Sequence, residues 1–152
     1  MALRERISDD LKTAMKSRDE VRVSTLRLIQ AAIKDRDIAA RDKDHAEGCE
    51  EKEIQQILTK MSKQREESAG AFENAGRLEL AEREREEQAV IRSYMPRQMS
   101  EAEIQAAAGG VVSELEATGL KDMGRCMQAL KTRYPGQMDF AKAGACVKDM
   151  LK

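Results

Sequence analysis

The chain has 152 residues, of which 41% are hydrophobic and 36% charged, and its formal net charge is −1. These values exclude a disordered chain, because apolar residues recur at helical spacing nearly throughout and suffice for a packed core. No run approaches the ~20 apolar residues of a membrane span, and the first residues lack the apolar core of a signal peptide, so we expect no membrane association. Three cysteines without a CxxC pair favour a reducing compartment. We therefore expect a cytoplasmic protein.

Two amphipathic helices are predicted at the N-terminus. In the first, apolar residues recur every four positions between charged ones; they are Leu3, Ile7, Leu11 and Met15. A break follows at about residues 17–20, where Asp19 is a suitable cap for the next helix. The second helix is the most apolar segment, and its expected buried residues are Val23, Leu26, Ile29, Ala32 and Ile33, with Val21 and Leu28 widening the face.

A long helical hairpin is predicted after a loop that spans about residues 42–49 and contains Gly48. Apolar residues at three- and four-residue spacing predict a long third helix. Asn74-Ala75-Gly76 is the signal that terminates it, because Gly76 suits the left-handed residue past a helix end. A fourth helix runs antiparallel to it, from about Leu78 to Tyr94. The expected inward residues are Ile54, Ile57, Leu58, Met61, Arg65, Ser68 and Phe72, then Ala81, Gln88, Ile91 and Tyr94, with Glu84 and Glu87 left unassigned.

A stop and a restart of helical structure lie close together between residues 94 and 104. Pro96 lacks an N–H group and ends the incoming helix. Ser100 and Glu103 form the pattern of a capping box, and Met99 with Ile104 forms that of a hydrophobic staple. A plain turn within one bundle would show the same signals. The change in composition across this segment favours a domain joint, with domains at 1–95 and 96–152.

The C-terminal part predicts three shorter helices. The apolar residues of the first are Ile104, Ala108, Val111 and Leu115. Asp122 is the expected cap of the next helix, from Met123 to about Arg133, and Asp139 that of the last. The last helix has Ala143, Cys146, Val147 and either Met150 or Leu151 facing inward. No segment alternates with a period of two, so the predicted fold is all-α, with an N-terminal bundle of long helices and a small C-terminal three-helix domain.

The sequence contains no recognisable catalytic, metal or cofactor site. The sole histidine, His45, lies in the predicted loop near Cys49, but Gly48 intervenes and no acid that could orient the histidine is evident. Neither of the glycine-rich phosphate-binding motifs occurs. The carboxylates of the hairpin are interleaved with bases, and none stands in an apolar setting that would raise its pKa. We therefore expect no catalytic residues, no metal and no cofactor.

A basic segment near the C-terminus is the candidate binding site. Seven basic and three acidic residues lie between position 121 and the end of the chain. A helix N-terminus flanked by bases suits contact with a phosphate backbone. The expected nucleic-acid-binding residues are Lys121, Gly124, Arg125, Lys131, Arg133 and Lys142. The alternative is that these are ordinary solvated charges, with Gly124 admitting a neighbouring helix.

Several short motifs, in this order and spacing, resemble the YqeY-like family over the whole chain. They are Ser24-Thr25-Leu26-Arg27-Leu28-Ile29, Phe72-Glu73-Asn74-Ala75-Gly76-Arg77, Tyr94-Met95-Pro96-Arg97-Gln98-Met99-Ser100-Glu101 and Lys121-Asp122-Met123-Gly124-Arg125. The C-terminal half is similar to the tail domain of GatB, the B subunit of the glutamine-dependent aminoacyl-tRNA amidotransferase. This chain departs from the family pattern at Gln128 and at Phe140-Ala141, where smaller residues are usual.

The resemblance implies a helical module that binds tRNA, or a tRNA-charging or amidotransferase complex, without chemistry of its own. It also implies an assignment to the carbon–nitrogen ligases that use glutamine as amido-N-donor. The catalytic portion of the amidotransferase subunit has no counterpart in this chain. The alternative hypothesis is a protein–protein adaptor that uses the hairpin of residues 50–94.

Overall fold

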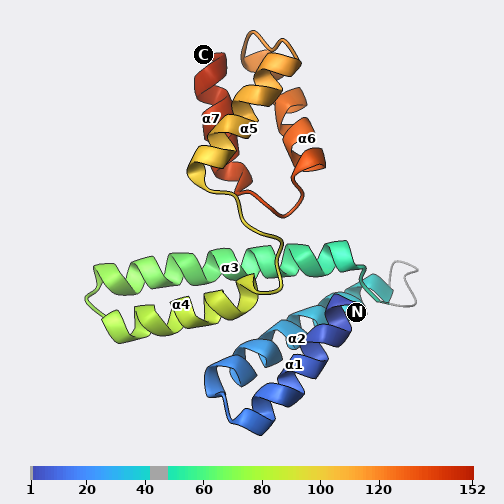
Figure 1. Ribbon diagram of the computed structural model, residues 1–152, viewed down its shortest axis with the longest axis vertical. Coiled ribbons are helices and arrows are strands. Elements are labelled where there is room, and N and C mark those ends of the chain that lie inside the picture. Colours follow the sequence, from blue (N-terminus) through green and yellow to red (C-terminus); the bar gives the residue numbers. More distant parts are fainter. Residues whose placement is uncertain (1, 42–47) are drawn as a thin grey trace. The chain divides into compact units, whose positions relative to one another are not determined.

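The computed structural model describes residues 2–41 and 48–152, and in this part of the chain it contains seven α-helices and no strand (Figure 1). The predicted all-α fold class is confirmed. No helix in the described part combines the length and apolar character needed to cross a membrane. The chain divides into two compact units, Met1–Met95 and Pro96–Lys152, here called the N-terminal and C-terminal units. That each unit is an independently folding domain stays a prediction.

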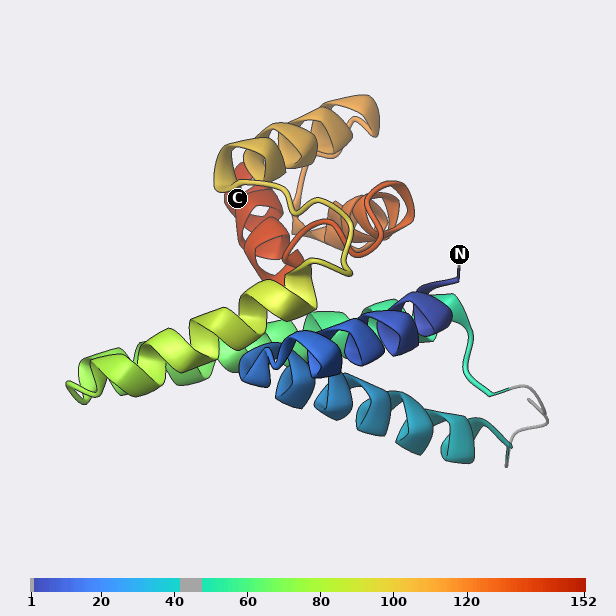
Figure 2. The same cartoon turned by 60° about the horizontal axis from the view of Figure 1, so that its bottom comes forward.

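The N-terminal unit consists of two helical hairpins. Its helices are α1 (Leu3–Ser17), α2 (Glu20–Arg41), α3 (Glu51–Asn74) and α4 (Leu78–Arg92). Helices α3 and α4 lie side by side as the predicted antiparallel hairpin, and α2 contacts α1, α3 and α4 (Figures 1 and 2). The core between the hairpins contains the fully buried side chains of Ile7, Leu26, Ile29, Leu58 and Ile91.

Two expected core residues of this unit are exposed. Met15 is 50% exposed, and Ala14, at 2%, takes its place in the core. An α-helix has 3.6 residues per turn, so Ala14 lies about three full turns after Leu3, whereas Met15 lies about a third of a turn away. Leu28 is 46% exposed, because it projects opposite the buried Leu26. The apolar face of α2 is therefore narrower than its composition suggests.

The ends of the N-terminal helices mostly follow the local signals. The Arg22 backbone N–H donates to Asp19 Oδ1 over 3.2 Å, which confirms Asp19 as the cap of α2. Gly76 is left-handed at φ 73°, as expected for the residue past the end of α3. Helix α4 ends at Arg92, two residues before the predicted end, and the backbone continues through short turns to Met95.

The C-terminal unit contains α5 (Glu101–Glu114), the short 3₁₀ helix η1 (Leu120–Asp122), α6 (Met123–Arg133) and α7 (Phe140–Leu151). Helix α5 packs against both α6 and α7. The core includes Ile104, Val111, Leu130, Val147 and Leu151. Since Leu151 is 4% exposed and Met150 is 39% exposed, Leu151 is the inward residue of the two that the sequence left open. The cap predicted at Asp139 is confirmed, because its Oδ1 accepts from the backbone N–H groups of Ala141 and Lys142.

The segment that begins the C-terminal unit is held in place by side-chain and backbone hydrogen bonds. Glu103 N donates to Ser100 Oγ and Ser100 N donates to Glu103 Oε1, each over 3.2 Å, which confirms the capping box. Met99 N donates to the Gln137 carbonyl oxygen over 2.7 Å. The Gln98 side chain donates to the Gly136 carbonyl oxygen over 2.8 Å. The segment is thus attached to the connection between α6 and α7.

The capping box should weaken in acid. The pKa of Glu103 is lowered to about 2, first by hydrogen bonds from Arg97 and then by the Ser100 backbone N–H. Because the folded-state pKa lies below the ordinary value of 4.5, the stabilisation is complete above that pH and is lost as the pH falls towards 2. An NMR titration of the Glu103 carboxyl carbon should give a midpoint near 2 that moves up in Arg97→Gln. A wild-type midpoint near 4.5 would show that the carboxylate does not make these contacts.

Candidate nucleic-acid interface

The start of α6 differs from the predicted capped helix. Asp122 has helical backbone angles (φ −91°, ψ −1°) and its side chain makes no capping bond, because η1 runs directly into α6. Its carboxylate instead accepts from Thr118 N and from Arg125 Nη2, each over 3.0 Å. The pKa of Asp122 is lowered by these contacts, with the Thr118 N–H as the main cause. The expected cap at Asp122 is therefore wrong.

This arrangement leaves fewer free amides for an anion at the start of α6. The Asp122 N–H donates to the Gly119 carbonyl oxygen over 2.9 Å, and the Met123 N–H donates to that of Leu120. A negative carboxylate, held by two partners, also occupies this end of the helix. A phosphate is therefore better received along the side of α6 than at its N-terminus.

A shallow groove of about 610 Å³ runs along α6 beside the end of α5. It is lined by Leu115, Gly124, Arg125, Gln128, Ala129, Thr132 and Arg133, and we call it the α6 groove. A Cβ atom added to Gly124 would meet nothing within 4 Å, so no neighbouring helix requires glycine there. The alternative explanation of Gly124 as a helix-packing glycine is thus not supported. Its missing side chain instead leaves backbone accessible from outside.

Three of the five predicted cations already have an acidic partner. Arg125 Nη2 lies 3.0 Å from Asp122 Oδ1, and Arg133 Nη1 lies 2.6 Å from Glu114 Oε2. Lys142 Nζ lies 3.5 Å from Glu101 Oε1. The exposed side chains of Lys121 and Lys131 form no ion pair within the described residues. The C-terminal unit as a whole carries eight basic and seven acidic residues, so its positive charge is local.

The structure gathers some of the six predicted residues and separates one. Gly124, Arg125 and Arg133 line the α6 groove. Lys131 follows Gly124 by seven residues, about two helical turns, and so lies on the same exposed side of α6. Lys142 lies elsewhere. Its partner Glu101 is the first residue of α5, whereas Glu114, the partner of Arg133, is the last. The two acids are about 20 Å apart along the helix axis, at ~1.5 Å per residue. The candidate interface therefore excludes Lys142.

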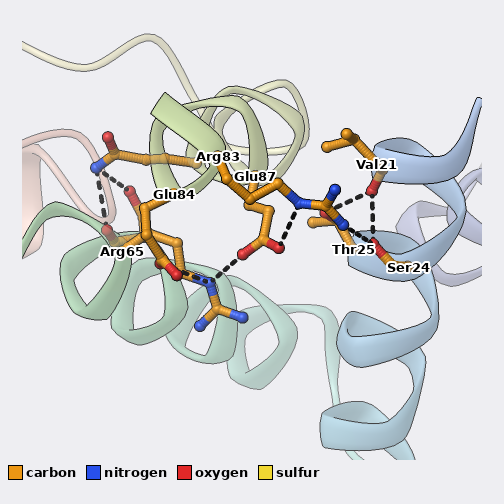
Figure 3. A network of polar contacts seen from close by, with 9 residues as sticks. Val21, Ser24, Thr25, Arg65, Arg83, Glu84 and Glu87 are labelled. Carbon is orange, nitrogen blue, oxygen red and sulfur yellow. Dashed lines mark hydrogen bonds and ion pairs between the residues drawn. The ribbon is translucent and has the colours of Figure 1, made fainter. Parts of the chain in front are cut away.

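The N-terminal unit contains a polar network that links α2, α3 and α4 (Figure 3). Arg65 Nε lies 3.2 Å from Glu87 Oε2 and 3.9 Å from Glu84 Oε2. Arg83 Nε approaches Glu87 within 3.3 Å, while its Nη2 donates to Ser24 Oγ over 3.2 Å. The sequence feature that could have indicated this network is Arg65, an arginine on the apolar face of α3, because a charged side chain that faces inward requires a partner. Each carboxylate here is paired, which makes the network a structural link between helices.

A second network joins three segments that are far apart in sequence. The Arg4 guanidinium donates to both oxygens of Asp37, over 2.7 and 2.9 Å, and Cys49 N donates to Asp37 Oδ1 over 2.9 Å. Arg4 is the main cause that holds the pKa of Asp37 well below its usual range. Burial raises the pKa of the Cys49 thiol. Nothing in the sequence indicated these contacts, since Arg4 and Asp37 lie 33 positions apart.

The sequence placed Cys49 near His45, a pairing that a Cys–His nucleophile would need. His45 lies outside the described part of the chain, so the structure adds nothing about that pair. The raised pKa of Cys49 keeps its thiol protonated, which makes it a poor nucleophile. Among residues 2–41 and 48–152, no group of three His, Cys, Asp or Glu side chains could hold a metal ion.

Comparison with known proteins places the chain among relatives of similar sequence. A family model described as Yqey-like protein matches residues 4–151, which confirms the expected resemblance. The chain is 33% identical to altered inheritance of mitochondria protein 41, mitochondrial, of Lachancea thermotolerans over 112 residues, covering 72% of this chain and 58% of that protein. It is 34% identical to the protein of the same name from Eremothecium gossypii over 116 residues, covering 74% and 60%. The chain thus spans less than two thirds of these relatives.

These relatives correct the expected location. Those from four organisms are named as mitochondrial proteins. They point to mitochondria rather than the cytoplasm, so the prediction of a cytoplasmic protein is wrong. An apolar core marks a secretory signal, whereas mitochondrial transit peptides are amphipathic and rich in arginine and serine, so the missing apolar core did not exclude mitochondria. Free cysteines do not distinguish one reducing compartment from another.

Proposed function

We propose, given that this chain belongs to the YqeY-like protein family, that its C-terminal unit is a non-catalytic module that binds tRNA through the α6 groove. One observation carries the proposal: two arginines and an open glycine line this groove, Lys131 is exposed on the same side of α6, and Lys121 is exposed three residues before Gly124. Cations along one helix suit the regularly spaced phosphates of a nucleic acid. The names of the curated relatives support a mitochondrial setting for this role.

The resemblance to the GatB tail suggests what accompanies the tRNA. A tRNA-charging or amidotransferase complex would supply the chemistry, and this chain would hold the RNA body by its backbone. Backbone contacts position an RNA but do not read its sequence. We therefore expect binding to several tRNA species with similar affinity.

Charge reversal at one lysine of η1 and one of α6 tests the proposal. In the double variant Lys121→Glu/Lys131→Glu, we expect tRNA affinity to fall by about tenfold or more, and the salt dependence to become shallower because phosphate contacts are lost. Fluorescence anisotropy of labelled tRNA, measured between 50 and 200 mM salt (roughly the range over which such contacts respond), gives both quantities.

The matched control is Lys148→Glu/Lys152→Glu, which makes the same change in net charge at the end of α7, in the same unit. Its affinity should change much less. An equal loss in both doubles would mean that only net charge matters, and unchanged binding in the first double would refute the interface.

A protein–protein adaptor is the second candidate, and exposed apolar residues on the hairpin favour it. Leu78 is 68% exposed and Leu80 is 44% exposed at the beginning of α4. They lie two positions apart and so point to different sides of the helix, but each is a large apolar side chain that a protein partner could cover. The two functions separate under ribonuclease: a tRNA-dependent complex dissociates when the RNA is digested, whereas an adaptor keeps its protein partner.

A further inference from the structure

The pairing of Arg133 with Glu114 bears directly on the α6 groove. Arg133 lines the groove, yet its guanidinium lies 2.6 Å from a carboxylate at the end of α5. The pair raises the pKa of Arg133 and lowers that of Glu114. Both side chains are largely exposed, at 42% and 57%. The groove therefore contains a cation that is neutralised, but only by a contact that water and other ions can reach.

We propose that Glu114 competes with an RNA phosphate for Arg133, and that this competition limits the affinity of the α6 groove. The inference rests on the proposed function and adds the regulation of that site. A phosphodiester offers the guanidinium the same two-oxygen geometry as a carboxylate. The exchange is feasible because exposed ion pairs are weak.

Glu114 differs in this respect from the other acid beside the groove. Asp122 accepts from the Thr118 backbone as well as from Arg125, and its side chain is only 13% exposed. Releasing Arg125 would leave that carboxylate fixed in place beside the incoming phosphate. Among the described residues, Glu114 has Arg133 as its one side-chain partner, so it can turn to solvent when a phosphate arrives. Arg133 is thus the exchangeable cation of the groove.

The affinity change follows from the fraction of time that Arg133 is free. When a binding-competent state is only partly populated, the apparent affinity falls by that fraction. An exposed pair of ordinary strength occupies the arginine for half of the time or more, so removing the carboxylate should tighten binding by about two- to sixfold.

The test compares two isosteric variants with the same change in net charge. Glu114→Gln removes the competing carboxylate, and Glu116→Gln removes an exposed carboxylate that forms no ion pair in the described part of the chain. Labelled tRNA is titrated with each full-length variant by fluorescence anisotropy. We expect Glu114→Gln to bind about two- to sixfold more tightly than Glu116→Gln. Equal affinities would overturn the proposal, because they would show an effect of net charge alone.

Two further variants identify the mechanism. In an Arg133→Gln background the advantage of Glu114→Gln over Glu116→Gln should vanish, and an advantage that persists would overturn the proposal. Glu114→Asp retracts the carboxylate by one methylene at constant net charge and should also bind more tightly than wild type; no gain would count against the exchange. Thermal unfolding verifies that each variant is folded. If wild type binds no tRNA, both the proposed function and this inference fail. If wild type binds tRNA in a salt-dependent way but Glu114→Gln and Glu116→Gln have equal affinities, only this inference fails.

Discussion

Replacing Leu130 with alanine is expected to lower the free energy of unfolding of the C-terminal unit by about 2 to 5 kcal/mol. Leu130 is fully buried in a core that this small unit builds from three helices and a short connection. A single core of this size rarely supplies more than about 3 to 5 kcal/mol. The variant unit should therefore be largely unfolded, and tRNA binding should be lost with it.

Hydrogen exchange read by mass spectrometry shows which part of the chain responds to Leu130→Ala. If the two units are independent domains, peptides from residues 96–152 lose protection while those from the N-terminal unit keep it. Leu120→Ala is the control, because Leu120 is 53% exposed and its truncation should change stability by less than about 0.5 kcal/mol. Loss of protection throughout the chain would contradict the prediction of two domains.

Replacing Gly48 with alanine is expected to destabilise the N-terminal unit by about 2 to 4 kcal/mol. Gly48 has φ +92°, a conformation that strains any residue with a side chain. An added Cβ would also lie 2.5 Å from Asp37 Oδ1. That oxygen cannot move away freely, since it accepts from both Arg4 and Cys49. The substitution therefore combines backbone strain with damage to a charge-assisted network.

Gly70→Ala provides a control of opposite sign. Gly70 lies within α3, and a Cβ there would meet nothing within 4 Å. Alanine favours the helix over glycine, so this variant should gain about 0.5 to 1 kcal/mol. Urea unfolding followed by circular dichroism compares both variants with wild type. A Gly48→Ala protein as stable as wild type would show that the Asp37 network does not require the glycine.

Local signals in the sequence predicted most helix ends, but one of them, the cap expected at Asp122, was wrong. Ser100 with Glu103 and Asp139 form the expected caps, because these bonds join residues two or three positions apart. Asp122 carried the same signal and does not cap its helix. A cap needs extended backbone angles at the capping residue, and η1 imposes helical angles on Asp122. The preceding turn, which the residue itself does not encode, decided the outcome.

The candidate site was less predictable than the helices that carry it. Its residues follow one another in sequence, which suggested one continuous basic patch. The structure pairs Arg133 with a residue 19 positions away and Lys142 with one 41 positions away. These pairings remove Lys142 from the groove and place an acid beside Arg133. The positions of cations could be anticipated from the sequence, but their freedom to bind a partner could not.

Hydrophobic pattern and local motifs were enough to predict the all-α class, the seven helical segments and the restart of helical structure at Ser100. These features depend on hydrophobic periodicity and on hydrogen bonds between near neighbours, both of which are local. The pairing of charges, as between Arg4 and Asp37 or Arg65 and Glu87, depends instead on how the helices pack. Such pairs form where packing brings helices together. The sequence offers many residues of opposite charge that could pair equally well, and the packing selects among them. The α6 groove has the same origin, since it lies between α6 and Leu115, the residue that follows α5.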